Sequence, residues 1–134
     1  MRIDWRRYWW QPGFAAAFLA VGLPYWLIPY NRINLPDALL GAGLLVLFAA
    51  AALARAFSGK SFIRVVAVMG AVAPAVVMTR VVFDGVRDAS SHNLWPLEVV
   101  IALVVGGAAA LAGAVLGSVV MRLWPARNDD GQGN

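Results

Sequence analysis

The sequence has no cysteine, a single histidine and few charged residues. The absence of cysteine excludes disulfides, thiolate catalysis and cysteine-ligated metals. Charged residues make up 13% of the chain and hydrophobic residues 61%, whereas a soluble domain is about a quarter charged and about half apolar. The apolar residues lie in long blocks, which is typical of a transmembrane protein.

Four of these blocks reach or approach the length of a membrane span. A helix that crosses about 30 Å of hydrocarbon needs about 20 mostly apolar residues, because it rises about 1.5 Å per residue. The blocks cover residues 14–30, 38–54, 65–83 and 99–121. The sequence therefore predicts an all-α membrane protein, a compact bundle of four transmembrane helices with short loops. Residues 14–123 form the transmembrane domain, residues 1–13 a cytoplasmic interfacial segment, and residues 124–134 a flexible cytoplasmic tail.

The basic residues are distributed unevenly between the two ends of the expected bundle. Lys and Arg near short loops stay in the cytoplasm, so the side with more of them is assigned there, and both termini are expected to be cytoplasmic. This topology also accounts for the net charge of +4 without nucleic-acid binding. Alanine richness and small size indicate a multi-pass protein of the bacterial inner membrane. The eight residues of the cytoplasmic side are Arg2, Arg6, Arg7, Arg55, Lys60, Arg64, Arg122 and Arg127, against Arg32, Arg80 and Arg87 on the other side.

The N-terminal WRRYWW motif combines aromatic and basic residues just before the first apolar block. Trp and Tyr favour the headgroup region, and arginine binds anionic lipid phosphates. Arg6, Arg7, Trp9 and Trp10 are therefore candidate lipid-headgroup contacts. A secretory signal peptide is the competing interpretation, but the apolar run is long and no small-x-small cleavage site follows it.

Prolines and small residues mark bends and close helix contacts. Pro24 and Pro29 predict that the outer end of the first helix is kinked or unravelled, either as a functional break or simply as a helix end at the interface. Pro74 predicts a kink in the third helix. A second pattern, of small residues spaced by four, forms a groove that admits a close helix neighbour, either from this chain or from a partner. This candidate packing face consists of Ala109, Gly113 and Gly117.

The stretch from Arg80 to Glu98 gathers five charged residues and the single histidine between two apolar blocks. Arg80, Asp84, Arg87 and Asp88 share one helix face and predict a ladder of opposite charges. Arg80 has two interpretations. It is either an intramembrane charge, paired with Asp84 or Glu98 in a polar cavity, or a residue one turn below the surface whose long side chain extends to the headgroups.

The same stretch is the expected outer connection between the third and fourth helices, and it is the surface that we expect to contact a partner. The lone histidine lacks the neighbouring ligands of a metal site, and no cofactor is expected. This candidate polar patch comprises Arg80, Asp84, Arg87, Asp88, His92, Trp95 and Glu98.

Small size and small-residue helix faces favour an accessory, structural or assembly subunit of a larger membrane complex. The expected partners are lipids and another integral membrane protein or further copies of the chain. The alternative is a homo-oligomeric channel or transporter for an ion or small solute, although a permeation path needs polar lining that these helices largely lack. Paired carboxylates, a Ser/Lys pair and a His cluster are absent from the apolar blocks, so no enzyme is expected.

Overall fold

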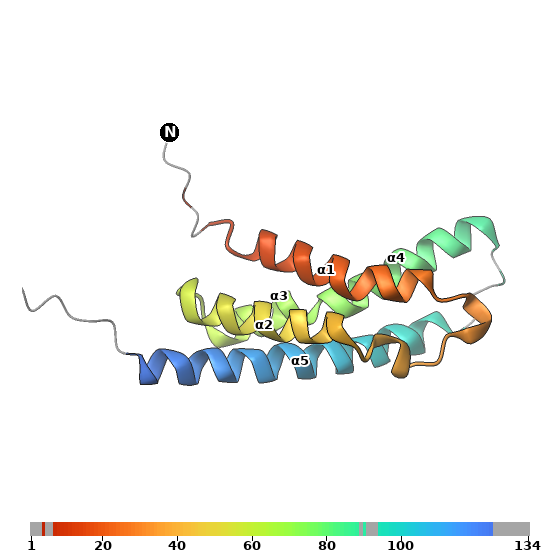
Figure 1. Ribbon diagram of the computed structural model, residues 1–134. Coiled ribbons are helices and arrows are strands. Elements are labelled where there is room, and N and C mark those ends of the chain that lie inside the picture. Colours follow the sequence, from red (N-terminus) through yellow and green to blue (C-terminus); the bar gives the residue numbers. More distant parts are fainter. Residues whose placement is uncertain (1–3, 5–6, 89, 91–93, 125–134) are drawn as a thin grey trace, which may run out of the picture.

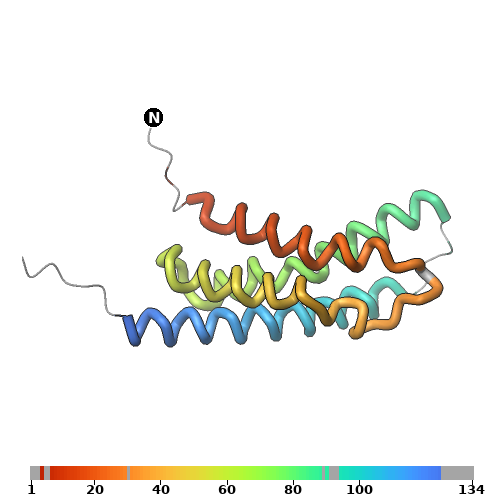
Figure 2. Tube along the Cα trace, in the orientation of Figure 1, coloured from red at the N-terminus to blue at the C-terminus, as the bar shows by residue number. Residues whose placement is uncertain are grey.

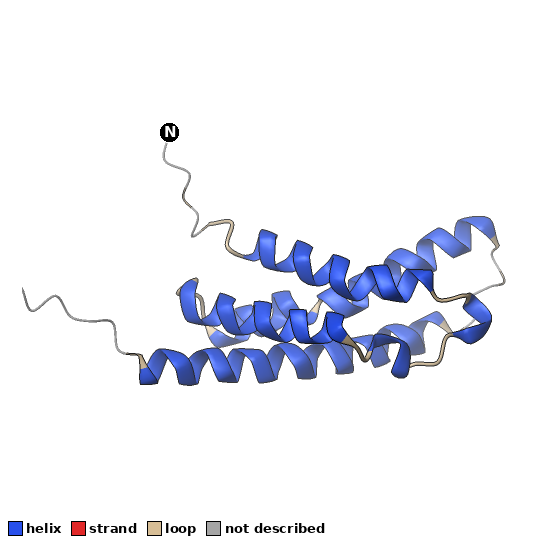
Figure 3. Ribbon diagram, viewed as in Figure 1, coloured by secondary structure: helices blue, strands red, loops and turns tan. Residues whose placement is uncertain are grey.

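The computed structural model describes residues 4, 7–88, 90 and 94–124, and this part of the chain is helical without a strand (Figures 1 and 3). Two short 3-10 turns, at Tyr30–Arg32 and Asp37–Leu39, lie in the connection that follows the first helix. The α-helices are α1 (Trp10–Leu27), α2 (Ala42–Phe57), α3 (Phe62–Gly70), α4 (Val72–Arg87) and α5 (Trp95–Leu123).

The helices lie lengthwise in one bundle, and α5 extends along its whole length (Figures 1 and 2). α5 contacts α2, α3 and α4, while α1 packs on α2 and α4. The start of α1, the α2–α3 connection and the end of α5 share one end of the bundle (Figure 1). The connection between α1 and α2 and the end of α4 lie at the other end. This up-and-down order is the one that four antiparallel helices with short connections produce.

α3 and α4 form one bent helix from Phe62 to Arg87. The bend is at Ala71, which separates α3 from α4 and lies three residues before Pro74. The Ala75 N–H still donates to the Ala71 carbonyl at 3.0 Å, so the backbone bends without unwinding. Proline lacks the N–H that would reach the fourth preceding carbonyl, and the kink predicted at Pro74 is confirmed.

Two of the four helical rods are long and apolar enough to cross a membrane. They are the bent helix of 26 residues and α5 with 29 residues. α2 is apolar but shorter, at 16 residues. The described part of the chain is therefore all-helical, with four rods of which two meet the criteria for a span.

Helix boundaries differ from the predicted ones at several ends. α1 begins at Trp10 rather than residue 14, because Pro12 is tolerated within a first helical turn. It ends at Leu27 rather than residue 30, because the residue before Pro29 is driven to an extended conformation. α5 begins at Trp95, four residues earlier than predicted, with Pro96 in its first turn. The predicted interfacial segment therefore ends inside α1, and the predicted tail beyond Trp124 lies outside the described residues.

The second helix also begins later than predicted, at Ala42 instead of residue 38. Residues 37–39 form a 3-10 turn, and Leu40 is extended before the helix begins. In this turn the Asn34 amide donates to the Asp37 carboxylate at 2.9 Å, and Leu39 is buried against α1. Because Leu39 is buried, the turn is apolar, and its hydropathy is the same as that of a helix.

Two adjoining apolar clusters form the core. One combines α1, α2, α3 and α5 around Leu47 and Met69, and the other combines α1, α4 and α5 around Tyr25 and Val76. Alanine is frequent in both, and this lets the helix axes approach closely.

Candidate functional site

Arg80 joins α4 to the end of α1, and it is buried with 9% of its surface exposed. Its Nη1 donates to the Tyr25 carbonyl at 2.6 Å, and its Nη2 donates to the Ile28 carbonyl at 2.7 Å. Its Nε donates to Asp84 Oδ2 at 3.2 Å within the same helix. The guanidinium also lies 5.2 Å from the centre of the Tyr25 ring. The side chain therefore turns inward to α1 instead of extending along its own helix to the surface.

The two carbonyls are accessible to Arg80 because α1 ends at a proline. In a continued helix the N–H of residue 29 would donate to the Tyr25 carbonyl, but Pro29 has none. The Ile28 N–H reaches this carbonyl only at 3.3 Å. The last carbonyls of a helix carry partial negative charge, so a cation is favoured there. Arg80 thus acts as the C-terminal cap of a helix more than 50 residues away in the sequence.

A cavity of about 330 Å³ adjoins this cap. The Trp26 side chain lines it. The Trp26 indole N–H donates to the Val76 carbonyl at 3.2 Å, which is a second link between α1 and α4. Arg87 stacks on the Phe83 ring, with 4.4 Å between its guanidinium carbon and the ring centre. The residues that line the cavity are Trp26, Thr79, Arg80, Phe83, Asp84 and Arg87.

The predicted charge ladder contains the Arg80–Asp84 pair, and its two other members have further contacts. Arg87 lies over Phe83, and Asp88 lies beyond the last turn of α4. The Asp88 carboxylate accepts hydrogen bonds from the Ser90 hydroxyl at 2.7 Å and the Ser90 N–H at 3.0 Å. These two bonds stabilise the ionised form and lower the pKa of Asp88.

The remaining members of the candidate polar patch do not share this cavity. Glu98 lies in the first turn of α5 and lines a separate, shallow hollow with Ile33 and Leu97. Trp95 opens α5 and is 45% exposed. His92 lies outside the described residues. The structure therefore brings Arg80, Asp84 and Arg87 together and assigns Glu98 to another surface.

The small-residue face of α5 lies against α2 of the same chain. A methyl group on Gly113 would collide with the Phe48 carbonyl oxygen, and one on Gly117 would collide with the Ala52 carbonyl oxygen. Ala109 packs beside them, against the core cluster around Leu47 and Met69. Of the two occupants considered for this groove, the structure has the chain's own second helix.

Two further glycines contact backbone that a proline leaves without its usual donor. Pro24 has no N–H for the Ala20 carbonyl, and a methyl group on Gly43 of α2 would collide with that oxygen. Pro74 has none for the Gly70 carbonyl, and a methyl group on Gly106 of α5 would lie 3.0 Å from it. Sequence reasoning missed these pairings and the Tyr25 and Ile28 acceptors. For Ala20, Tyr25 and Gly70 the available signal was that each is the fourth residue before a proline, whereas Ile28 had no such signal.

At the other end of the bundle lie the candidate lipid-headgroup residues. Arg7, Trp9 and Trp10 lie at the start of α1, with Arg7 exposed, and Arg6 is outside the described residues. Arg55, at the end of α2, donates from Nη1 to the Lys60 carbonyl at 3.2 Å. It also contacts Met121 Sδ at 3.5 Å, which connects the α2–α3 turn to α5.

Among the described residues, no three His, Cys, Asp or Glu side chains come together as metal ligands would. No protein-family model matches the sequence, and neither a characterised protein nor a solved structure matches it. A proposal for the function of the chain therefore depends on its geometry alone.

Proposed function

We propose that this chain is a small integral membrane protein that serves as an accessory, structural or assembly subunit of a larger membrane complex. Four spans, with both termini in the cytoplasm of a bacterial cell, are part of the proposal. The positive side of the bundle is then the end that holds the α2–α3 turn.

The outer surface of the bundle supports membrane embedding. α1, α2 and α5 expose large apolar side chains along their length, and the bent α3–α4 helix exposes them near its two ends. A soluble monomer rarely exposes contiguous apolar patches larger than a few hundred Å². The shorter α1 and α2 share this property with the two long rods. Examples of such exposed residues are Leu23 and Leu27 on α1, Leu45 and Leu53 on α2, Ile63 on α3, Val82 on α4, and Leu103 and Val104 on α5.

The observation that carries the functional proposal is the apolar filling of the interior. Besides Tyr25, the buried polar or charged side chains of the described residues are Ser58 and Arg80, which lie at opposite ends of the bundle. Near those ends, the Thr79 and Ser118 hydroxyls donate to carbonyls of their own helices at 2.8 and 2.9 Å. Solute passage and intramembrane catalysis need polar groups that face a shared path. A bundle without such groups in its middle acts through its surfaces.

The end of α4 is the surface that we assign to the partner. It diverges from α5 toward its C-terminus (Figure 1), and Val82, Phe83 and Val86 are 59%, 59% and 84% exposed there. Arg87 and Asp88 add both charge signs next to this apolar face. Aromatic residues and arginine are enriched in protein interfaces, and the rim of an interface is polar, which fits an exposed phenylalanine beside Arg87 and Asp88.

The test is to recover the protein from native membranes with a C-terminal tag and a photoreactive residue at Val86. A stoichiometric adduct to a larger membrane protein is expected at Val86, and none at Leu45, which is 70% exposed on α2 and serves as the control. A homo-oligomer with no companion would contradict the accessory role and favour the channel alternative, to be followed by flux assays in liposomes.

The proposed topology is testable because the natural chain has no cysteine. Single substitutions Ser61→Cys and Ser90→Cys place one thiol at each end of the bundle, both at exposed positions. An impermeant maleimide added to intact cells should label Ser90→Cys alone, and Ser61→Cys only after lysis. Labelling of Ser61→Cys in intact cells would refute the orientation.

A further inference from the structure

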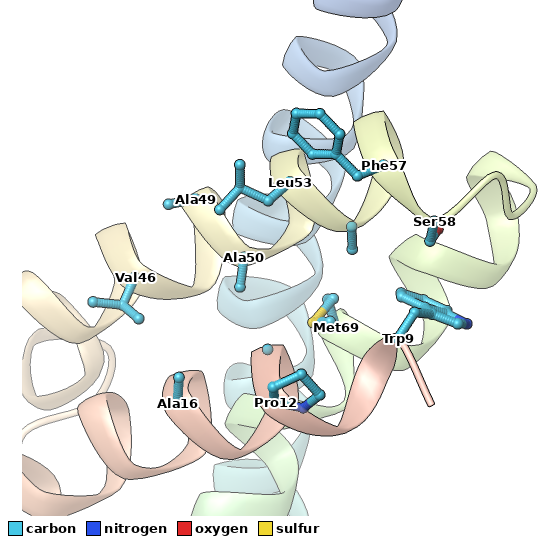
Figure 4. A pocket seen from close by; sticks show the side chains of 12 residues that line it. Trp9, Pro12, Ala16, Val46, Ala49, Ala50, Leu53, Phe57, Ser58 and Met69 are labelled. Atoms are coloured by element: carbon cyan, nitrogen blue, oxygen red, sulfur yellow. The ribbon is translucent and has the colours of Figure 1, made fainter. Parts of the chain in front are cut away.

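A second cavity, of about 540 Å³, lies between α1 and α2 at the end of the bundle where α1 begins (Figure 4). α1 contributes Pro12, Gly13 and Ala16, and Met69 of α3 lies at the base. Its α2 side runs from Val46 to Phe57, which is about 16 Å along the helix axis. Nearly all of its lining is apolar, so it is a groove long enough for an extended hydrocarbon segment.

The groove exists because both of its walls carry small side chains without the close helix approach found elsewhere in the bundle. Where α2 meets α5, and where Gly43 meets α1, the glycines contact backbone carbonyls directly. Along the groove, Ala16 and Ala49 are instead exposed. In a bilayer, packing alone drives apolar surfaces together, so an unfilled groove of this kind would be occupied by lipid or by protein.

Charge at the open end distinguishes between these occupants. Ser58 lies at this end of the groove (Figure 4). Its hydroxyl accepts the backbone N–H of Lys60 at 3.2 Å, so the Lys60 backbone adjoins this end. Trp9 lies beside Ser58 at the same end of the groove, and indole rings favour headgroup depth. The described charged residues of this end are five basic ones and one acidic one: Arg7, Arg55, Lys60, Arg64 and Arg122, and Asp4.

We infer that the groove binds one anionic glycerophospholipid, with an acyl chain between α1 and α2 and its phosphate at the Lys60 and Trp9 edge. A basic rim attracts an anionic headgroup, and the apolar walls suit a chain that enters from the bilayer. This inference depends on the proposed membrane embedding, and it goes beyond the expected headgroup contacts because it names a groove for the chain.

Ala16 and Ala15 provide a matched pair of variants. Ala16→Leu adds bulk inside the groove at an exposed position, so the bundle should still fold. Ala15→Leu adds the same bulk at an exposed position that does not line the groove. Lys60→Gln removes one positive charge from this end and leaves the apolar walls unchanged.

The experiment first shows that the protein resists alkaline extraction from membranes, and then measures phosphatidylglycerol and phosphatidylcholine binding to detergent-purified protein by native mass spectrometry. We expect one phosphatidylglycerol per chain, at least about tenfold weaker binding in Ala16→Leu, and no change in Ala15→Leu. Lys60→Gln should bind the two lipids with more similar affinity.

Equal phosphatidylglycerol binding by Ala16→Leu and the wild type would overturn the inference. A second protein chain that binds the wild type and Ala15→Leu but not Ala16→Leu would also overturn it, because the groove would then hold protein. Either result would leave the membrane proposal intact. A chain released by alkaline extraction would overturn both. A folding control is the helical circular dichroism of each variant. Brominated acyl chains provide a second measurement, since they should quench wild-type tryptophan fluorescence more than that of Trp9→Phe.

Discussion

Replacing Arg80 with leucine tests the bond network that holds α1 to α4. The change removes two hydrogen bonds to carbonyls, at 2.6 and 2.7 Å, and the ion pair with Asp84. A hydrogen bond to a charged group contributes about 1.5–3 kcal/mol, and loss of one member of a buried ion pair costs about 3–5 kcal/mol. The Asp84 side chain is 28% exposed, which favours the lower values. We therefore expect Arg80→Leu to lower the free energy of unfolding by about 3 kcal/mol.

Arg80→Lys should have an intermediate effect. A lysine keeps the positive charge, but its single ammonium group lacks the planar fork that reaches Asp84 and both carbonyls at once. We expect a loss of about 1–2 kcal/mol, close to the contribution of one such hydrogen bond.

Arg87→Leu is the matched control, because Arg87 is on the same helix, is exposed and stacks on Phe83. An exposed cation–π contact contributes about 0.5–1 kcal/mol, and leucine and arginine have similar helix propensity. Unfolding in mixed detergent micelles, followed by tryptophan fluorescence and circular dichroism, compares the three variants. If Arg80→Leu destabilised the protein no more than Arg87→Leu, the reasoning would be refuted.

Two other predictions follow from the helix contacts and from the outer connection. Gly113→Ala should destabilise the protein by about 1–3 kcal/mol, because the added methyl group meets the Phe48 carbonyl. Gly107 lies on the same helix, and a methyl group there would meet nothing within 4 Å, so Gly107→Ala should be neutral or slightly stabilising. Equal unfolding curves for the two variants would contradict the packing of α5 on α2. Ser90→Ala should raise the pKa of Asp88, because both Ser90 bonds favour the carboxylate, although the N–H bond remains. The stabilising effect of these bonds is present above the ordinary pKa of an aspartate and is lost as the pH falls through the lowered folded value. A carboxyl titration followed by NMR measures this shift, and an unchanged Asp88 curve would rule out the hydroxyl bond.

The sequence by itself determined the helical class and most of the bends. Long apolar blocks allow helices and show no alternation of polar and apolar residues typical of strands. The missing N–H of a proline is a local property that favours a bend or an end of a helix. The kink near Pro74 and the end of α1 before Pro29 were both predictable on that basis. The late start of α2 was not, because an apolar 3-10 turn and an apolar helix have the same hydropathy.

Tertiary structure decided the direction of Arg80 and the occupant of the α5 groove. An arginine near the end of a helix reaches either the surface or a neighbouring helix, and its own sequence context is the same in both cases. The inward direction depends on the free carbonyls of α1, which the fold brings next to α4. Gly113 and Gly117 likewise offer a flat face to any helix, and the fold places α2 of the same chain against it. The local sequence determines which donor groups and helix faces a segment has. Only the packing of segments distant in the sequence determines which carbonyl or helix contacts them.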